Sequence, residues 1–147
     1  MLILPQEALL SMRRHALDTY PEECCGILLG RAGEPGAGDR ERERRVARAL
    51  PARNLNRERA ADRYLLDPAD QFRAERQARF EGLEVLGFYH SHPDHPCLPS
   101  ATDLQLSWEG YSYLILAVRE GSGVEERCWR RAPGNPARFS EEALRTP

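Results

Sequence analysis

The stretch LEVLGFYHSHP, residues 83–93, decides how this chain folds. It opens with an apolar, β-prone run that is typical of a buried strand. Because alternate residues of a strand point to the same face, His90 and His92 are expected to face one way and Ser91 the other. Pro93 cannot donate a hydrogen bond to a neighbouring strand, so the strand is expected to end there.

A second polar segment follows this strand after a short loop. Ser100 is a suitable helix N-cap, and Asp103 stands at the third helical position, directly before an apolar run. The end of a strand and the start of a helix would thus bring two imidazoles and one carboxylate together. Three protein ligands and one open position are typical of catalytic zinc sites, whereas structural zinc sites usually have four protein ligands.

The joint pattern therefore predicts Zn²⁺ bound by His90, His92 and Asp103. Each part alone is weaker evidence. A His-x-His pair is common without a metal, and Ser100 with Asp103 could form only a capping box.

Length and composition limit the class of protein. A chain of 147 residues has the length of one domain, and we expect residues 1–147 to form a single α/β (α+β) domain with a curved, mixed sheet. The net charge of −2 indicates no nucleic-acid-binding surface. No apolar run is long enough for a membrane span, and the N-terminus lacks the apolar core of a secretory signal. Together with four cysteines that show no CxxC spacing, this predicts a cytoplasmic protein with reduced thiols.

Apolar periodicity and turn residues predict the remaining elements. Strands are expected at residues 1–4, 24–30, 46–50, 64–66, 111–118 and 124–131. Helices are expected at residues 5–20, 68–81 and 100–109, where Asp67 caps the second, Gly82 ends it, and Gly110 ends the third. Residues 33–38 are typical of a hairpin tip. From about residue 132 we expect a poorly ordered tail with a short helix capped by Ser140.

Two motifs resemble those of the JAMM (MPN-plus) zinc metallopeptidases. The first is HSHP at residues 90–93, followed after six residues by Ser100 and then Asp103. The second is PEECCGILLG at residues 21–30, which resembles the strand that carries the family's glutamate. The resemblance covers nearly the whole chain. It implies a compact fold related to that of cytidine deaminases, with zinc at the edge of a curved sheet flanked by helices.

The resemblance also implies catalytic roles for individual residues. The family's glutamate stands two residues after the proline, which selects Glu23 over Glu22 as the general base. The Ser100 hydroxyl would then stabilise the oxyanion of an attacked amide. Asn54, in a loop of residues 51–56, is a candidate for supporting the site from outside the ligand set, although loop asparagines more often satisfy turns.

The short chain looks like the small bacterial branch of the family, because it lacks the large insertions of eukaryotic deubiquitinating members. That branch is associated with ubiquitin-like sulfur-carrier proteins. The resemblance therefore implies hydrolysis of an amide bond at the C-terminal Gly-Gly tail of such a carrier.

Three other functions are open at this point. The same fold serves in non-catalytic MPN modules that bind proteins, but these usually lack the metal ligands. A zinc deaminase would need a Cys-x-x-Cys ligand pair and a glutamate next to its histidine ligand, and neither is present. A JAMM peptidase with a different substrate is also compatible with the motifs. His95 and Cys97 lie in the loop between the ligands, where we expect an exposed histidine and a small loop residue.

Overall fold

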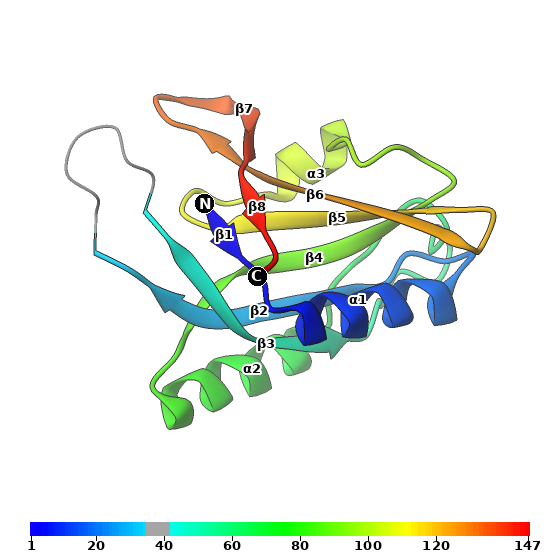
Figure 1. Ribbon diagram of the computed structural model, residues 1–147. Helices are drawn as coiled ribbons and strands as arrows, with labels where there is room; N and C mark the ends of the chain where they lie inside the picture. Colours follow the sequence, from blue (N-terminus) through cyan, green and yellow to red (C-terminus); the bar gives the residue numbers. More distant parts are fainter. Residues whose placement is uncertain (35–41) are drawn as a thin grey trace.

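The computed structural model describes residues 1–34 and 42–147, whose strands form one mixed sheet in the order β7-β6-β5-β4-β2-β3-β1-β8 (Figure 1). Strands β4 and β5 run parallel, as do β1 and its neighbours β3 and β8, and the other pairs are antiparallel. The elements in chain order are β1 (Leu2–Ile3), α1 (Gln6–Thr19), β2 (Cys25–Ala32), β3 (Arg44–Ala52), α2 (Pro68–Glu81), β4 (Glu84–Pro93), α3 (Ala101–Leu106), β5 (Ser112–Arg119), β6 (Gly123–Ala132), β7 (Asn135–Glu142) and β8 (Leu144–Arg145). The predicted mixed sheet with flanking helices is confirmed.

The sheet curves until its two edges meet. Strands β7 and β8 lie at opposite ends of the strand order, yet only Ala143 separates them in the chain. The carbonyl of Ala143 accepts a hydrogen bond from the N–H of Leu2 at 2.8 Å. Buried Glu142 reinforces this junction, because it accepts a hydrogen bond from the Ser112 hydroxyl at 2.6 Å and pairs with the N-terminal ammonium of Met1 at 3.4 Å. The curvature is therefore held by contacts between the chain termini and the central strands.

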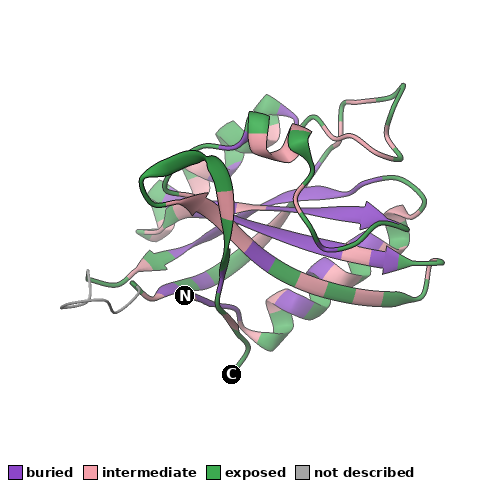
Figure 2. Cartoon of the chain, turned by 90° about the horizontal axis from the view of Figure 1, so that it is seen from above, coloured by how far each residue is buried: buried purple, intermediate pink, exposed green. Residues whose placement is uncertain are grey.

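Helices α1 and α2 pack on opposite faces of the sheet (Figure 1). Helix α1 packs in one core cluster with Leu28 of β2, and helix α2 packs Ala74 and Ala78 in another with Ile27 and Leu29. Successive residues of β2 thus serve opposite faces, as strand alternation requires. Figure 2 shows the buried residues concentrated on the central strands. Within the described residues, no helix has both the length and the apolar character needed to cross a bilayer.

The predicted helix signals are confirmed at three ends and wrong at one. Asp67 caps α2 by accepting from the N–H of Ala69 at 2.8 Å, and Gly82 follows the helix with a φ of 65°. Ser100 caps α3 as expected. Helix α3 nevertheless ends at Leu106, well before residue 109.

The early end of α3 follows from contacts with Arg131 of β6. Its guanidinium donates to the Ser107 hydroxyl at 2.9 Å, to the Ser107 carbonyl at 2.8 Å and to the Leu104 carbonyl at 3.1 Å. These bonds satisfy the free carbonyls of the last turn, which a continued helix would otherwise use.

The predicted C-terminal helix is wrong. Residues 135–142 form β7 and residues 144–145 form β8, so the expected poorly ordered tail pairs with β6 and β1 instead. The ring of Phe139 packs edge-on against Tyr113 with centroids 5.7 Å apart, so burial against β5 favours the strand over the local capping signal of Ser140. Residues 64–66 form no strand either, since Leu66 makes only an isolated bridge with Asn54. The predicted hairpin tip falls largely on residues 35–41, outside the described residues.

Candidate metal centre

Pairing of β4 with β2 fixes which side chains face the site. The Ser91 hydroxyl accepts the N–H of Cys24 at 2.8 Å, and the N–H of Ser91 donates to the Cys24 carbonyl at 3.1 Å. Ser91 is thereby tied into the sheet, away from its two histidine neighbours. This antiparallel register places Glu23, just before β2, beside the end of β4 that carries His90 and His92.

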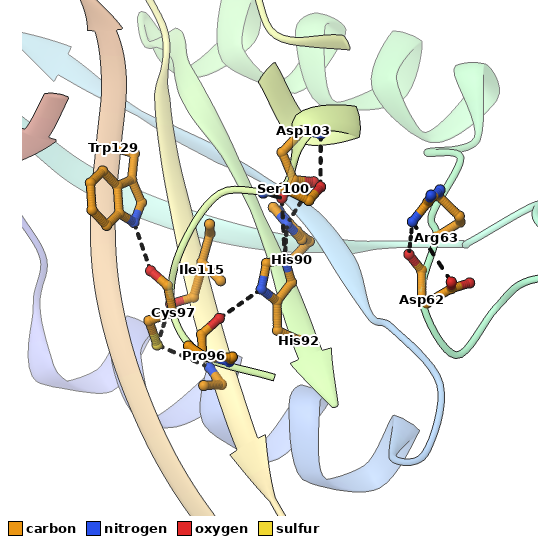
Figure 3. Close-up of polar contacts among 11 residues, drawn as sticks. Asp62, Arg63, His90, His92, Pro96, Cys97, Ser100, Asp103, Ile115 and Trp129 are labelled. Atoms are coloured by element: carbon orange, nitrogen blue, oxygen red, sulfur yellow. Dashed lines mark hydrogen bonds and ion pairs between the residues drawn. The ribbon is translucent and has the colours of Figure 1, made fainter. Parts of the chain in front are cut away.

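Three polar side chains converge at this end of β4 (Figure 3). The Nε2 atoms of His90 and His92 lie 3.0 Å apart. Asp103 contributes one carboxylate oxygen to each, Oδ1 at 3.2 Å from His90 Nε2 and Oδ2 at 3.2 Å from His92 Nε2. Both imidazoles are nearly inaccessible, with 1% of His90 and 7% of His92 exposed. The strand and the start of α3 therefore meet as the sequence predicted.

This donor set fits a metal ion. His92 Nδ1 lies 2.9 Å from the carbonyl of Pro96, and because a carbonyl only accepts, Nδ1 carries a proton. In the neutral ring, the form that binds a metal, Nε2 then presents a lone pair. Lone pairs and a carboxylate that face one point repel each other unless a cation lies between them. Tetrahedral zinc with bonds of about 2.0–2.1 Å would hold its ligand atoms roughly 3.3 Å apart. The observed separations of 3.0 to 3.2 Å are close to this spacing.

Asp103 is held in place by the capping box of α3. The backbone N–H of Ser100 donates to Asp103 Oδ2 at 2.8 Å, and the backbone N–H of Asp103 donates to the Ser100 hydroxyl oxygen at 3.0 Å. Burial alone would raise the pKa of Asp103, but the neighbouring imidazoles of His90 and His92 and the backbone N–H of Ser100 outweigh it and hold the pKa well below its usual range. The carboxylate is therefore ionised at neutral pH, as a metal ligand must be.

Glu23 lies in the same small pocket, whereas Glu22 is exposed. Only 5% of Glu23 is accessible, and the ligand atoms of Glu23, His90 and His92 all lie within 4.8 Å of one another. Burial raises the pKa of the Glu23 carboxyl to about 7. A carboxyl group with this pKa can both accept and release a proton near neutrality.

The Ser100 side chain lines this pocket too, from the side of α3. Its oxygen already accepts the N–H of Asp103, so its O–H proton is free to donate to a bound group. The candidate base Glu23, the three candidate metal donors and the hydroxyl of Ser100 are thus brought together.

The chain matches the family described as prokaryotic homologs of the JAB domain over residues 5–132. It belongs to this family. The resemblance of its motifs to JAMM zinc metallopeptidases is thereby confirmed.

Several curated relatives of this JAB-domain protein are proteases by name. A desampylase from Haloferax volcanii is 39% identical over 123 residues, which cover 78% of this chain and 81% of that protein. A probable TtuB-protein conjugate cleaving protease from Thermus thermophilus is 33% identical over 117 residues, which cover 80% of this chain and 70% of that protein. A CysO-cysteine peptidase from Mycobacterium bovis is 29% identical over 134 residues, which cover 90% of this chain and 84% of that protein.

Solved structures share the fold. The solution structure of a protein from Desulfitobacterium hafniense superposes with a TM-score of 0.83 at 29% identity, covering 100% of this chain and 93% of that one. The solution structure of a protein from Salinibacter ruber superposes with a TM-score of 0.72 at 39% identity, covering 98% of this chain and 90% of that one.

Asn54 organises the loop of this JAB-domain protein that borders the candidate metal donors His90, His92 and Asp103. Its side-chain amide donates to the carbonyls of Glu23 at 3.2 Å and Arg63 at 3.1 Å. Its side-chain oxygen accepts the N–H groups of Leu65 and Asn56, both at 2.9 Å. Asn54 therefore touches the backbone of Glu23 and none of the metal donors.

The loop between β3 and α2 contributes three residues to the pocket that the sequence did not predict, namely Asp62, Arg63 and Tyr64. The ring of Tyr64 stacks on His90 with centroids 4.7 Å apart and planes at 27°. No spacing rule relates these residues to the histidines, because the loop that carries them is held by tertiary hydrogen bonds, those of the Asn54 side chain among them.

The two other residues singled out in the ligand loop stay outside the pocket. His95 is exposed and borders a separate hollow beside Asp94 and Glu120. Cys97 is buried, its thiol lies 3.6 Å from the carbonyl of Ile115, and its own carbonyl accepts the indole N–H of Trp129 at 2.9 Å (Figure 3). These contacts anchor the ligand loop to β5 and β6.

Proposed function

We propose that this JAB-domain protein is a zinc-dependent peptidase that hydrolyses the amide bond after the C-terminal glycine of a ubiquitin-like sulfur-carrier protein. The observation that carries the proposal is the approach of Asp103 to within 3.2 Å of both imidazole Nε2 atoms, with the Glu23 carboxylate in the same pocket. The relatives support the substrate class, since they are named for cleaving TtuB-protein conjugates and for CysO-cysteine.

His90, His92 and Asp103 would hold the zinc ion. Bound zinc supplies Lewis-acid chemistry, which polarises a carbonyl and lowers the pKa of a coordinated water to about 7. Asp103 suits the role of ligand because its pKa lies well below the usual range, so the carboxylate stays charged. Glu23 suits proton transfer better, because its pKa is about 7.

Glu23 would move the proton in both halves of the reaction. It accepts a proton from the attacking water and returns it to the nitrogen of the leaving amine, so that no net proton is consumed by the enzyme. The carbonyl oxygen becomes negatively charged in the intervening step. The free O–H of Ser100 donates a hydrogen bond to that oxygen and stabilises it.

The pocket favours small residues at the scissile bond. It is narrow and is lined by Glu23, Asp62, Arg63, Tyr64, Ser100, Thr102, Asp103 and Leu106. A tail that ends in two glycines brings its carbonyl to the site without side chains to accommodate.

We further propose that residues 1–147 work as one catalytic domain in the cytoplasm, since all four cysteines are free thiols and buried, which suits a reducing compartment.

A carrier fused through its Gly-Gly terminus to a short peptide tests this function. The zinc-loaded protein is incubated with the fusion, and intact-mass spectrometry locates the cut. We expect cleavage directly after the second glycine, loss of cleavage in a chelator, and recovery on adding zinc. A fusion with Ala-Ala in place of Gly-Gly is the matched control and should be cleaved more slowly. An inert zinc-loaded protein would leave a non-catalytic binding role, and preferred cleavage of the Ala-Ala fusion would point to another substrate.

A further inference from the structure

We infer that Tyr64 is a positioning residue of the metal centre, which acts by holding the imidazole ring of His90 in its ligating orientation. The inference rests on the proposed function, because it takes Nε2 of His90 to be a metal ligand. It is carried by two independent observations, the stack between the two rings and an unpaired nitrogen on His90.

The two imidazoles differ in how their outer nitrogens are bound. Histidines that bind a metal usually donate their other ring N–H to a carboxylate or a carbonyl, which sets the rotation of the ring. His92 follows this rule, with Nδ1 2.9 Å from the carbonyl of Pro96. His90 does not, because its Nδ1 atom is buried and has no hydrogen-bond partner among the described residues. No polar contact therefore sets the rotation of the His90 ring from its outer side.

Tyr64 supplies the missing restraint by packing. Its ring lies nearly parallel to that of His90, with centroids 4.7 Å apart and planes at 27°. Rotation of the imidazole about its bond to Cβ would drive a ring edge into the phenol, so the stack limits His90 to orientations near the observed one. This is the orientation in which Nε2 faces His92 and Asp103.

The backbone of Tyr64 is fixed on both sides, as this role requires. The side chain of Asn54 binds both neighbours of Tyr64. It donates to the Arg63 carbonyl at 3.1 Å and accepts the Leu65 N–H at 2.9 Å. The carbonyl of Leu65 also accepts the N–H of Leu55 at 2.7 Å. The Tyr64 ring therefore lies on a loop segment whose backbone is fixed by hydrogen bonds on both sides.

Substitutions that separate the ring from the hydroxyl test the inference. No hydrogen bond engages the Tyr64 hydroxyl within the described residues, so Tyr64→Phe should keep the zinc affinity of the wild type. Tyr64→Leu keeps an apolar side chain but removes the stack, and we expect it to weaken zinc binding by about 10–100-fold. Tyr111→Leu is the matched control, because Tyr111 packs edge-on against Phe88 at 5.5 Å, away from the site, and it should leave the affinity unchanged.

Competition with a chelator gives the zinc affinity of each variant, and circular dichroism of the metal-free protein shows that it is folded. The inference is overturned if Tyr64→Leu binds zinc as tightly as the wild type, or if Tyr64→Phe loses as much affinity as Tyr64→Leu. Should Tyr64→Leu fail to fold, nuclear Overhauser contacts between the two rings in zinc-loaded wild type decide, since their absence would also overturn it. A wild-type protein that binds no zinc would instead overturn the proposed function itself, which keeps the two failures distinguishable.

Discussion

The side-chain amide of Asn54 donates a 3.2 Å hydrogen bond to the backbone carbonyl of Glu23. The same side chain binds three further backbone groups of the loop that borders the pocket. The position of the proposed general base is therefore coupled to the loop through one amide, although that amide touches no metal donor.

Replacing Asn54 with Ala should lower both stability and turnover. Several backbone groups would lose their partner, and we expect the free energy of unfolding to fall by about 1–3 kcal/mol. The turnover number kcat should fall as well, because the backbone carbonyl of Glu23 loses the hydrogen bond that fixes its position. Asn56→Ala is the control, since the Asn56 side chain accepts only the N–H of Arg59 among the described residues. Equal effects of the two substitutions in urea unfolding and in kcat would contradict this role.

Glu23→Gln should abolish most turnover while zinc stays bound. Loss of a general base typically costs about 10²–10⁴ in rate. The amide keeps the shape of the side chain, and His90, His92 and Asp103 remain in place. Glu22→Gln, at the exposed neighbour, should cleave the carrier fusion like the wild type. The choice of Glu23 would be wrong if the effects of the two substitutions on kcat were reversed.

Metal-free protein should lose stability as the pH rises through the pKa of Glu23. Burial raises this pKa from 4.5 to about 7, so the folded state binds the proton more tightly than the unfolded state does. The associated stability is fully present below pH 4.5 and is lost as the pH rises to about 7. The loss amounts to about 3 kcal/mol. Glu23→Gln should lack this component, so its stability relative to wild type should improve between pH 4 and pH 8 in chemical denaturation. A constant difference across this range would contradict a raised pKa.

Two charged neighbours should shift the acid limb of the pH–rate profile in opposite directions. Asp62 raises the pKa of Glu23 by repulsion between negative charges, and Arg63 lowers it by attraction. Asp62→Asn should therefore move the acid limb of kcat/KM to lower pH, and Arg63→Gln should move it to higher pH. Shifts in the same direction would show that Glu23 does not set this limb.

The parts of the site that depend on local rules could be predicted from the sequence. Strand alternation placed His90 and His92 on one face, and the capping rules placed Asp103 at the start of α3. Both rules act over a few residues, so no tertiary information was needed. The family resemblance added Glu23, whose position depends on the pairing of β2 with β4.

The parts that depend on distant contacts could not be predicted. Helix α3 ends early because Arg131, far along the chain, binds its last carbonyls. The C-terminal segment forms strands because it closes the sheet, which overrides the local capping signal of Ser140. Tyr64 reaches His90 because the hydrogen bonds of Asn54 and the backbone pairing of Leu55 with Leu65 hold its loop, and sequence spacing gives no sign of these contacts.

Zinc content after exhaustive dialysis shows whether His90, His92 and Asp103 form a metal site. We expect one zinc ion per chain in the wild type and loss of that ion in Asp103→Asn, whose amide cannot replace the charged ligand. Asp62→Asn removes a carboxylate from the same pocket without touching the proposed ligand set, and it should keep the ion. A folded wild-type protein without zinc, or an Asp103→Asn variant that retains a full equivalent, would show that these three side chains do not hold the metal.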